Sequence, residues 1–336
     1  DARLREAACE GAARYGIGGG ASHLILGHSE AHHALELALA AFVSLPRALL
    51  FSTGYMANLG VVTALVVRGD AVFADKLNHA SLNDACQLSR AQFKRYAHND
   101  LTQLEQLLAT TKARRKLIAV DAVFSMDGDI APVRELVALA DRHDAWILLD
   151  DAHGFGVLGE NGRGVLEHFN VKHPRVIYMG TLGKAAGVCG AFVAGEADLI
   201  ETLMQRARTY IYTTAIPPLL ACALMKSVEL IADGGALRQQ LQKNIYQLKQ
   251  ILTSIPSSWR LLSSDTAIQP LIIGDNRAAL AVADALKARG ILVPAIRPPS
   301  VPPNTARLRI SLSAAHTADD IRQLGTALRD AATVFT

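Results

Sequence analysis

The stretch LLDDAHG at residues 148–154 decides the fold of this 336-residue chain. It begins as an apolar strand, continues into Asp150, Asp151 and His153, and leads into a glycine-rich turn. Ligands of open α/β sheets bind beyond the carboxyl ends of the strands. Burying a carboxylate at the end of a buried strand is unfavourable in free energy unless a positive group pairs with it. A metal ion, a substrate cation or a protonated pyridine nitrogen would each serve, so the motif alone leaves the ligand open.

Short apolar runs alternate with helical patterns on both sides of this stretch. Such alternation is typical of βαβ units around a mostly parallel sheet, and nearly continuous apolar runs indicate strands covered on both faces. The predicted strands are Ala48–Phe51, Ala71–Ala74, Gln92–Tyr96, Leu117–Val123, Trp146–Leu149, Val176–Met179 and Ala191–Ala194. The predicted helices include residues 1–15, His33–Phe42, Leu101–Ala109 and Val133–His143. We therefore expect an α/β fold.

The pattern changes near Pro217, where long helices and then a smaller strand-containing unit begin. The predicted elements are helices Leu219–Ile231, Leu237–Leu252 and Ala278–Ala288, and strands Ile268–Ile273, Ile291–Ala295 and Arg307–Leu312. We expect a large domain over residues 1–235 and a small α+β domain over residues 236–336.

Composition narrows the class of protein. Half of the residues are hydrophobic and 19% are charged, which is typical of a well-buried enzyme. A net charge of +3 gives no argument for a nucleic-acid partner. No apolar run approaches the roughly 18 residues that a membrane span needs. The four cysteines form no CxxC pair, which favours reduced thiols in a cytoplasmic protein over disulfides or a zinc site.

A lysine follows a second strand, in YMGTLGKAAG at residues 178–187. Desolvation lowers the pKa of an amine, so Lys184 would be a good nucleophile toward an aldehyde. A phosphate-binding P-loop requires GxxxxGK followed by Ser or Thr, whereas here Ala185 follows and the glycine spacing is too short. We therefore exclude a P-loop.

A third strand end, LFSTGYMAN at residues 50–58, leads from a polar turn into a helix. Free N–H groups at a helix start bind phosphate, and Gly54 allows close approach. The glycines at residues 16–20 follow no strand, which argues against a dinucleotide site and an NAD-dependent dehydrogenase. Pyridoxal 5′-phosphate (PLP) needs a lysine, a carboxylate for its ring nitrogen, a phosphate site and a group on its ring face. Lys184, Asp150, residues 50–58 and His79 supply these.

His28, His32 and His33 raise the alternative of a metal site, because residues i and i+4 share a helix face. No carboxylate follows at the HExxH spacing, and the segment is amphipathic. We therefore predict no metal ligand.

Four motifs together resemble the α-oxoamine synthases, and the resemblance covers essentially the whole chain. They are DxLxHAS at residues 75–81, VFSMDGD at 123–129, DDAHG at 150–154 and TLGK at 181–184. The resemblance implies a fold-type I PLP-transferase (aspartate-aminotransferase-like) fold and a condensation of an amino acid with an acyl thioester. It implies that Lys184 carries PLP and removes the substrate Cα proton, Asp150 pairs with the ring nitrogen, His153 bonds the ring hydroxyl, and His79 stacks on the ring and touches substrate.

The resemblance also implies the rest of the site. The backbone of Gly54 and Tyr55, with the side chains of Ser125 and Thr181, would hold the cofactor. Thr213 and Thr214 would reach the phosphate of a neighbouring subunit, which makes the active site a property of a homodimer.

The C-terminal segment AIRPPSVP at residues 295–302 most resembles the biotin-pathway branch of the family. This branch condenses L-alanine with pimeloyl-CoA or pimeloyl-acyl-carrier protein, giving 8-amino-7-oxononanoate, CO2 and free thiol. Arg297 would bind the alanine carboxylate through a bidentate pair, and Ser300 replaces the usual threonine. The alternative is 2-amino-3-ketobutyrate CoA ligase, which uses glycine and acetyl-CoA. A protein of this fold without catalytic activity is a further alternative.

The family's N-terminal segment, which supplies an Arg and an Asn to the substrate site, has no counterpart here. The chain lacks an initiator Met and opens within a predicted helix, so we expect an upstream segment to be missing. On this hypothesis the 336-residue form binds PLP but turns over slowly.

Overall fold

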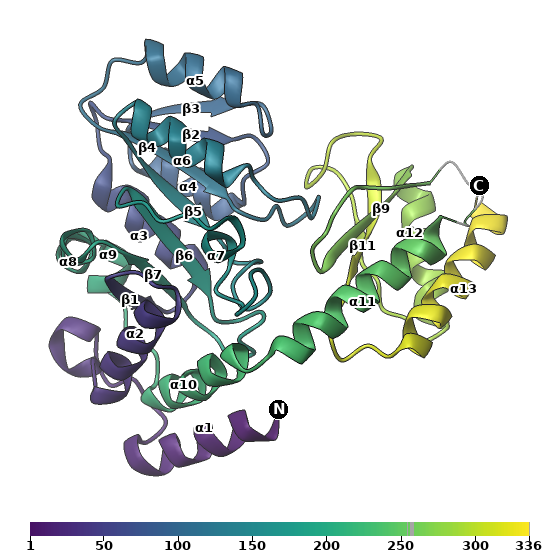
Figure 1. Cartoon of the computed structure of the whole chain (residues 1–336), viewed down its shortest axis with the longest axis horizontal. Helices are drawn as coiled ribbons and strands as arrows, with labels where there is room; N and C mark the ends of the chain where they lie inside the picture. The colour runs from purple at the N-terminus through teal and green to yellow at the C-terminus, as the bar shows by residue number, and fades with distance from the viewer. Residues whose placement is uncertain (254, 256–258, 336) are drawn as a thin grey trace. The chain divides into compact units, whose positions relative to one another are not determined.

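The computed structural model describes residues 1–253, 255 and 259–335 (Figure 1). Two compact units make up the chain. The first comprises Asp1–Val123 and Ala131–Gly234, and the second comprises Phe124–Ile130 and Gly235–Thr336.

The first unit contains a seven-stranded sheet in the order β1-β7-β6-β5-β4-β2-β3. Its strands are β1 (Arg47–Phe51), β2 (Ala71–Asp75), β3 (Gln92–Tyr96), β4 (Lys116–Asp121), β5 (Ala145–Asp150), β6 (Val176–Thr181) and β7 (Ala191–Gly195). Strands β3, β2, β4, β5 and β6 run parallel, while β7 is antiparallel to both β6 and β1. The predicted α/β fold with a mostly parallel sheet is confirmed.

Helices surround this sheet because its central strands are apolar on both faces and must be covered. They are α1 (Ala2–Tyr15), α2 (Glu30–Phe42), α3 (Gly54–Leu65), α4 (Ala80–Leu88), α5 (Leu101–Thr110), α6 (Val133–Arg142), α7 (Val165–Phe169), α8 (Ala197–Arg206), α9 (Arg208–Ile211) and α10 (Pro218–Ala232), with a π-helical turn η1 (His23–Gly27). One core cluster joins α3 to the sheet through buried residues such as Val61, Leu148 and Ile177. This packing fixes the start of α3 beside the strand ends.

The second unit contains a four-stranded antiparallel sheet in the order β10-β11-β9-β8, together with helices. Its elements are α11 (Gly235–Leu252), β8 (Arg260–Leu261), β9 (Ile268–Gly274), α12 (Asn276–Ala288), β10 (Ala295–Ile296), β11 (Ala306–Ser311) and α13 (Ala318–Phe335). The predicted strand Ile291–Ala295 is wrong, since of these residues only Ala295 lies in a strand, β10, which pairs with β11. Pro294 interrupts that run because proline has no N–H to donate.

The short segment Phe124–Ile130 belongs to the second unit, although the prediction placed it in the large domain. Ser264 Oγ donates to Gly128 O at 2.8 Å, and Arg307 Nη1 donates to Met126 O at 3.2 Å. These long-range bonds hold the segment, and no local pattern in the sequence predicts them.

Within the part of the chain that the structure describes, no helix combines the length and the apolar character needed to cross a membrane.

Candidate active site

The carboxyl edge of the parallel strands carries the candidate site. Strands β4 and β5 are in register with Asp121 opposite Asp150, and β5 and β6 are in register with Asp150 opposite Met179. Lys184 follows β6 by a few residues. Because parallel strands end at the same edge of a sheet, their last residues and following loops meet there.

Asp150 is the central carboxylate, and it is 6% exposed. Asn58 Nδ2, from α3, donates to its Oδ2 at 2.7 Å, and the Ala152 N–H donates to its Oδ1 at 3.0 Å. Burial raises the pKa of Asp150, while these bonds and the positive charge of Lys184 act in the opposite direction. The site therefore holds a carboxylate that gains from a cationic hydrogen-bond donor.

Asp151, the next residue in the motif, instead makes hydrogen bonds that stabilise the fold. Its Oδ2 accepts hydrogen bonds from the Val165 N–H at 2.7 Å and from the Tyr178 hydroxyl at 2.8 Å. Burial raises its pKa to about 7. Successive side chains of an extended chain point to opposite sides, so only one of the two adjacent carboxylates reaches the site.

Asp121 is a functional candidate that the sequence analysis missed. Its Oδ2 accepts the His79 N–H at 2.9 Å, and among the described residues its buried Oδ1 has no hydrogen-bond partner. Burial and then the charge of Asp150 raise its pKa. An acidic residue ending an apolar strand is the same signal that identified Asp150, and it was present in the predicted strand Leu117–Val123.

Lys184 and His153 meet at this edge. The Lys184 Nζ lies 3.0 Å from the His153 Nε2, and both side chains lie toward the surface. His153 comes from the turn that follows β5, and Lys184 from the turn between β6 and β7. The structure thus brings together a primary amine, an imidazole and a buried carboxylate from two neighbouring strand ends.

His79 stands at the start of α4 as its N-cap residue. Its Nδ1 lies 2.8 Å from the Ser81 Oγ, and its backbone is held by Asp121 as described above. Asn78 is buried and donates to Ala119 O at 2.7 Å. An exposed ring on an anchored backbone suits a residue that packs against a ligand.

The start of α3 is the place where we expect the phosphate to bind. Thr53 caps the helix by accepting the Met56 N–H at 3.1 Å, and the first N–H groups of a helix have no intrahelical partner. A Cβ added at Gly54 would lie 3.7 Å from Met179 and 3.9 Å from Thr181. Tyr55 is partly exposed, and its hydroxyl donates to Asp84.

The remaining predicted residues are distributed over both units. Thr181 Oγ1 donates to Gly190 O at 3.2 Å. Thr214 forms a β-bridge with Ser22, and it is exposed, whereas its neighbour Thr213 is half-buried. Three predicted residues, Ser125, Arg297 and Ser300, belong to the second unit. There Ser125 O accepts from Arg309 Nε at 2.6 Å, while Arg297 and Ser300 are exposed.

These residues fit PLP. An amine available for an aldehyde, a buried carboxylate for a protonated ring nitrogen and a helix start for a phosphate all come from adjacent strand ends. The repulsion between Asp121 and Asp150, two buried carboxylates side by side, would be relieved by the positive ring nitrogen.

Comparisons with known proteins agree with this chemistry. The model of the aminotransferase class I and II family matches residues 4–328. The 8-amino-7-oxononanoate synthase of Nitrosospira multiformis is 65% identical over 327 residues, covering 97% of this chain and 82% of that protein. That of Nitrosomonas eutropha is 63% identical over 332 residues, covering 98% and 85%.

Solved structures of PLP-dependent enzymes also superpose on this chain. The Sphingomonas wittichii serine palmitoyltransferase superposes with a TM-score of 0.95 at 34% identity, covering all of this chain and 85% of that one. A serine palmitoyltransferase from S. paucimobilis, solved with bound PLP and myriocin, has the same TM-score at 32% identity, covering all of this chain and 84% of that one. The 8-amino-7-oxononanoate synthase of Francisella tularensis superposes with a TM-score of 0.84 at 32% identity, covering 98% and 92%. The chain therefore belongs to the aminotransferase class I and II family and, within it, to the PLP-dependent 8-amino-7-oxononanoate synthases.

Proposed function

We propose that this chain condenses L-alanine with a pimeloyl thioester, releasing CO2 and the free thiol and yielding 8-amino-7-oxononanoate for biotin biosynthesis. The acyl carrier is either CoA or an acyl-carrier protein. The observation that carries the proposal is the 3.0 Å approach of Lys184 Nζ to His153 Nε2 at the strand edge that also holds buried Asp150. The names of relatives at 63–65% identity support the choice of reaction.

When bound, PLP supplies the electron sink for negative charge at the amino-acid Cα. Asp150 would keep the ring nitrogen protonated, because a proton shared with a buried carboxylate is retained. The N–H groups of Gly54 and Tyr55, with Thr181 and Ser125, would bind the cofactor. His79 would pack on the ring face.

Lys184 would transfer the proton of the alanine Cα. Its Nζ would remove the Cα proton of alanine and later return a proton to the product carbon. His153 Nε2, next to this amine, would bond the ring hydroxyl and so keep the reacting groups in place. Arg297 and Ser300 would bind the alanine carboxylate, since a guanidinium matches a carboxylate with two parallel hydrogen bonds.

We infer that the enzyme acts as a homodimer in the cytoplasm. Apolar side chains around the bridge between Ser22 and Thr214 are exposed, including Ile17 (80%), Ile25 (70%), Leu26 (88%) and Tyr212 (70%). A patch of this kind favours burial against another protein surface. The neighbouring Thr213 and Thr214 would then reach the cofactor phosphate of the second subunit.

The test combines spectroscopy with product analysis on the purified protein. With PLP added, wild type should show a visible absorption band that Lys184→Ala lacks, and should form 8-amino-7-oxononanoate from L-alanine and pimeloyl-CoA, detected by mass spectrometry. Condensation of glycine with acetyl-CoA instead would favour the ligase alternative. Bound PLP without either product would favour a non-catalytic protein of this fold.

A further inference from the structure

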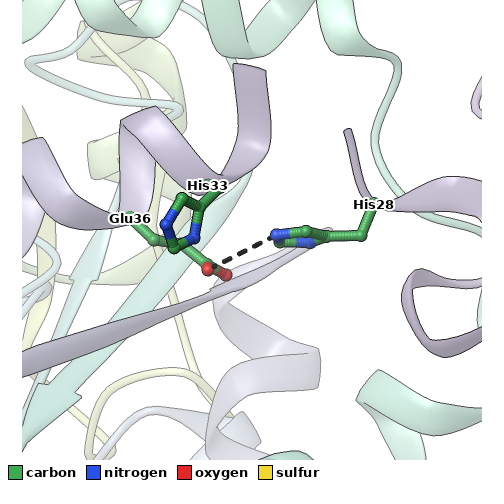
Figure 2. A group of neighbouring side chains, drawn as sticks. All are labelled: His28, His33 and Glu36. Carbon is green, nitrogen blue, oxygen red and sulfur yellow. Dashed lines mark ion pairs between the residues drawn. The ribbon is translucent and has the colours of Figure 1, made fainter. Parts of the chain in front are cut away.

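A group of histidines around the start of α2 has no role in the proposed reaction. His33 and Glu36 lie one turn apart on this helix, and His28 approaches them from the segment before it (Figure 2). One nitrogen of each histidine and one oxygen of Glu36 all lie within 4.8 Å of one another. His28 Nε2 is 3.7 Å from Glu36 Oε2.

The cluster differs from a metal site made of His28, His32 and His33 on one helix face. Helix α2 begins at Glu30, so His28 lies outside it and shares no helix face with His32. Both ring nitrogens of His32 already have partners, since Nδ1 accepts the Ser29 N–H at 3.0 Å and Nε2 lies 2.7 Å from Ile216 O. Glu36 instead completes the group, at a spacing from His33 that the HExxH pattern does not include.

Two of the three side chains, those of His28 and Glu36, are also contacted by residues outside the cluster. His28 Nδ1 lies 3.0 Å from His23 Nδ1, and the His23 ring stacks on Tyr210 with 4.7 Å between centroids. Glu36 Oε1 accepts the Leu50 N–H at 2.9 Å. Outer partners of this kind orient metal ligands and leave the opposite donor atom, here His28 Nε2 and Glu36 Oε2, available for an ion.

We propose that His28, His33 and Glu36 form a Zn²⁺ site. Two imidazoles and one carboxylate are a typical three-ligand set for zinc, with a fourth position left for water. Ligand atoms about 2.0–2.2 Å from a tetrahedral ion lie roughly 3.3 Å apart, so the 3.7 Å pair needs only a small movement. His33 is exposed and can rotate to complete the site. The site uses none of the residues proposed for PLP and alanine.

The experiment measures Zn²⁺ binding to the PLP-loaded, chelator-treated full chain by competition with a chromophoric chelator. Wild type should bind one Zn²⁺ per chain at this site. His33→Ala and Glu36→Gln should each weaken that binding by more than about 10-fold, which is the loss typical of even an outer partner. In Glu36→Gln the side-chain oxygen can still accept the Leu50 N–H, so this variant keeps the fold.

His168→Ala is the matched control, because His168 is an exposed histidine on another helix. It should bind Zn²⁺ as tightly as wild type. Co²⁺ in place of Zn²⁺ should give visible ligand-field bands that disappear in His33→Ala and persist in His168→Ala. The proposal is overturned if wild type shows no saturable Zn²⁺ binding, or if His33→Ala binds as tightly as wild type.

Discussion

The sheet edge and the histidine cluster each place a carboxylate beside nitrogen bases, and they differ in the groups around that carboxylate. Asp150 lies opposite a second acid, Asp121, and near the positive charge of Lys184. Glu36 instead faces an imidazole, with 3.7 Å between its Oε2 and the His28 Nε2. Paired acids with a fixed amine suit an organic cation such as a protonated ring nitrogen. Two imidazoles with one acid suit a metal ion, because they are a typical ligand set for zinc.

Removing the amine from the sheet edge should have the largest effect. Lys184→Ala should lower kcat by about 10⁴-fold or more, because the general base and the cofactor attachment are lost together. The measurement is 8-amino-7-oxononanoate formation at saturating PLP. Lys172→Ala, at another exposed lysine, should match wild type. Activity of Lys184→Ala close to wild type would remove this residue from the reaction.

Neutralising the central carboxylate, Asp150, should have the second-largest effect. Asp150→Asn can still accept from Asn58 but carries no charge, and one charge at this distance shifts a partner's pKa by about 1–3 units. We expect kcat to fall by roughly 10- to 1000-fold, with the absorption of bound PLP changed. The test is a steady-state assay with parallel spectra. An unchanged kcat would show that Asp150 does not control the cofactor ring.

Asp121 tests whether the second acid positions His79. Asp121→Ala removes the acceptor of the His79 N–H, a charge-assisted bond of about 1.5–3 kcal/mol, so kcat should fall about tenfold or more. Asp121→Asn retains an acceptor oxygen and should recover much of that loss. Comparing the two variants by kcat and KM separates positioning from charge. Equal losses in both would assign the effect to the charge of Asp121.

Asp151 should affect stability and not catalysis, and its effect near neutral pH should be small. Its folded pKa of about 7 lies above the ordinary value of 3.8. The stability that this group contributes is therefore complete below about pH 4 and is lost as pH rises through 7. Between pH 6 and 7 the loss should be about 1 kcal/mol.

Urea unfolding midpoints at the two pH values measure this loss in wild type and in Asp151→Asn. The variant cannot ionise, so its midpoint should change less between pH 6 and 7 than that of wild type. The same change in both proteins would contradict the raised pKa.

Much of the molecule follows from local patterns. The strand predicted at Gln92–Tyr96 has those bounds in the structure, and the strand ending at Asp150 was predicted to within one residue at each end. The wrong prediction of a strand at Ile291–Ala295 shows the limit of such patterns. An apolar run with a proline looks like a strand, but pairing depends on a partner that lies beyond the local sequence.

The sequence by itself determined the succession of strands and helices along the chain and pointed to Lys184, Asp150 and His153 as candidate site residues, because strand period and motif residues are local properties. Only the tertiary structure decided that Asp121 lies opposite Asp150 and that Glu36 meets His28. Both pairs join residues from different elements. Their approach depends on strand register and on where a helix begins, and these are set by packing across the whole unit.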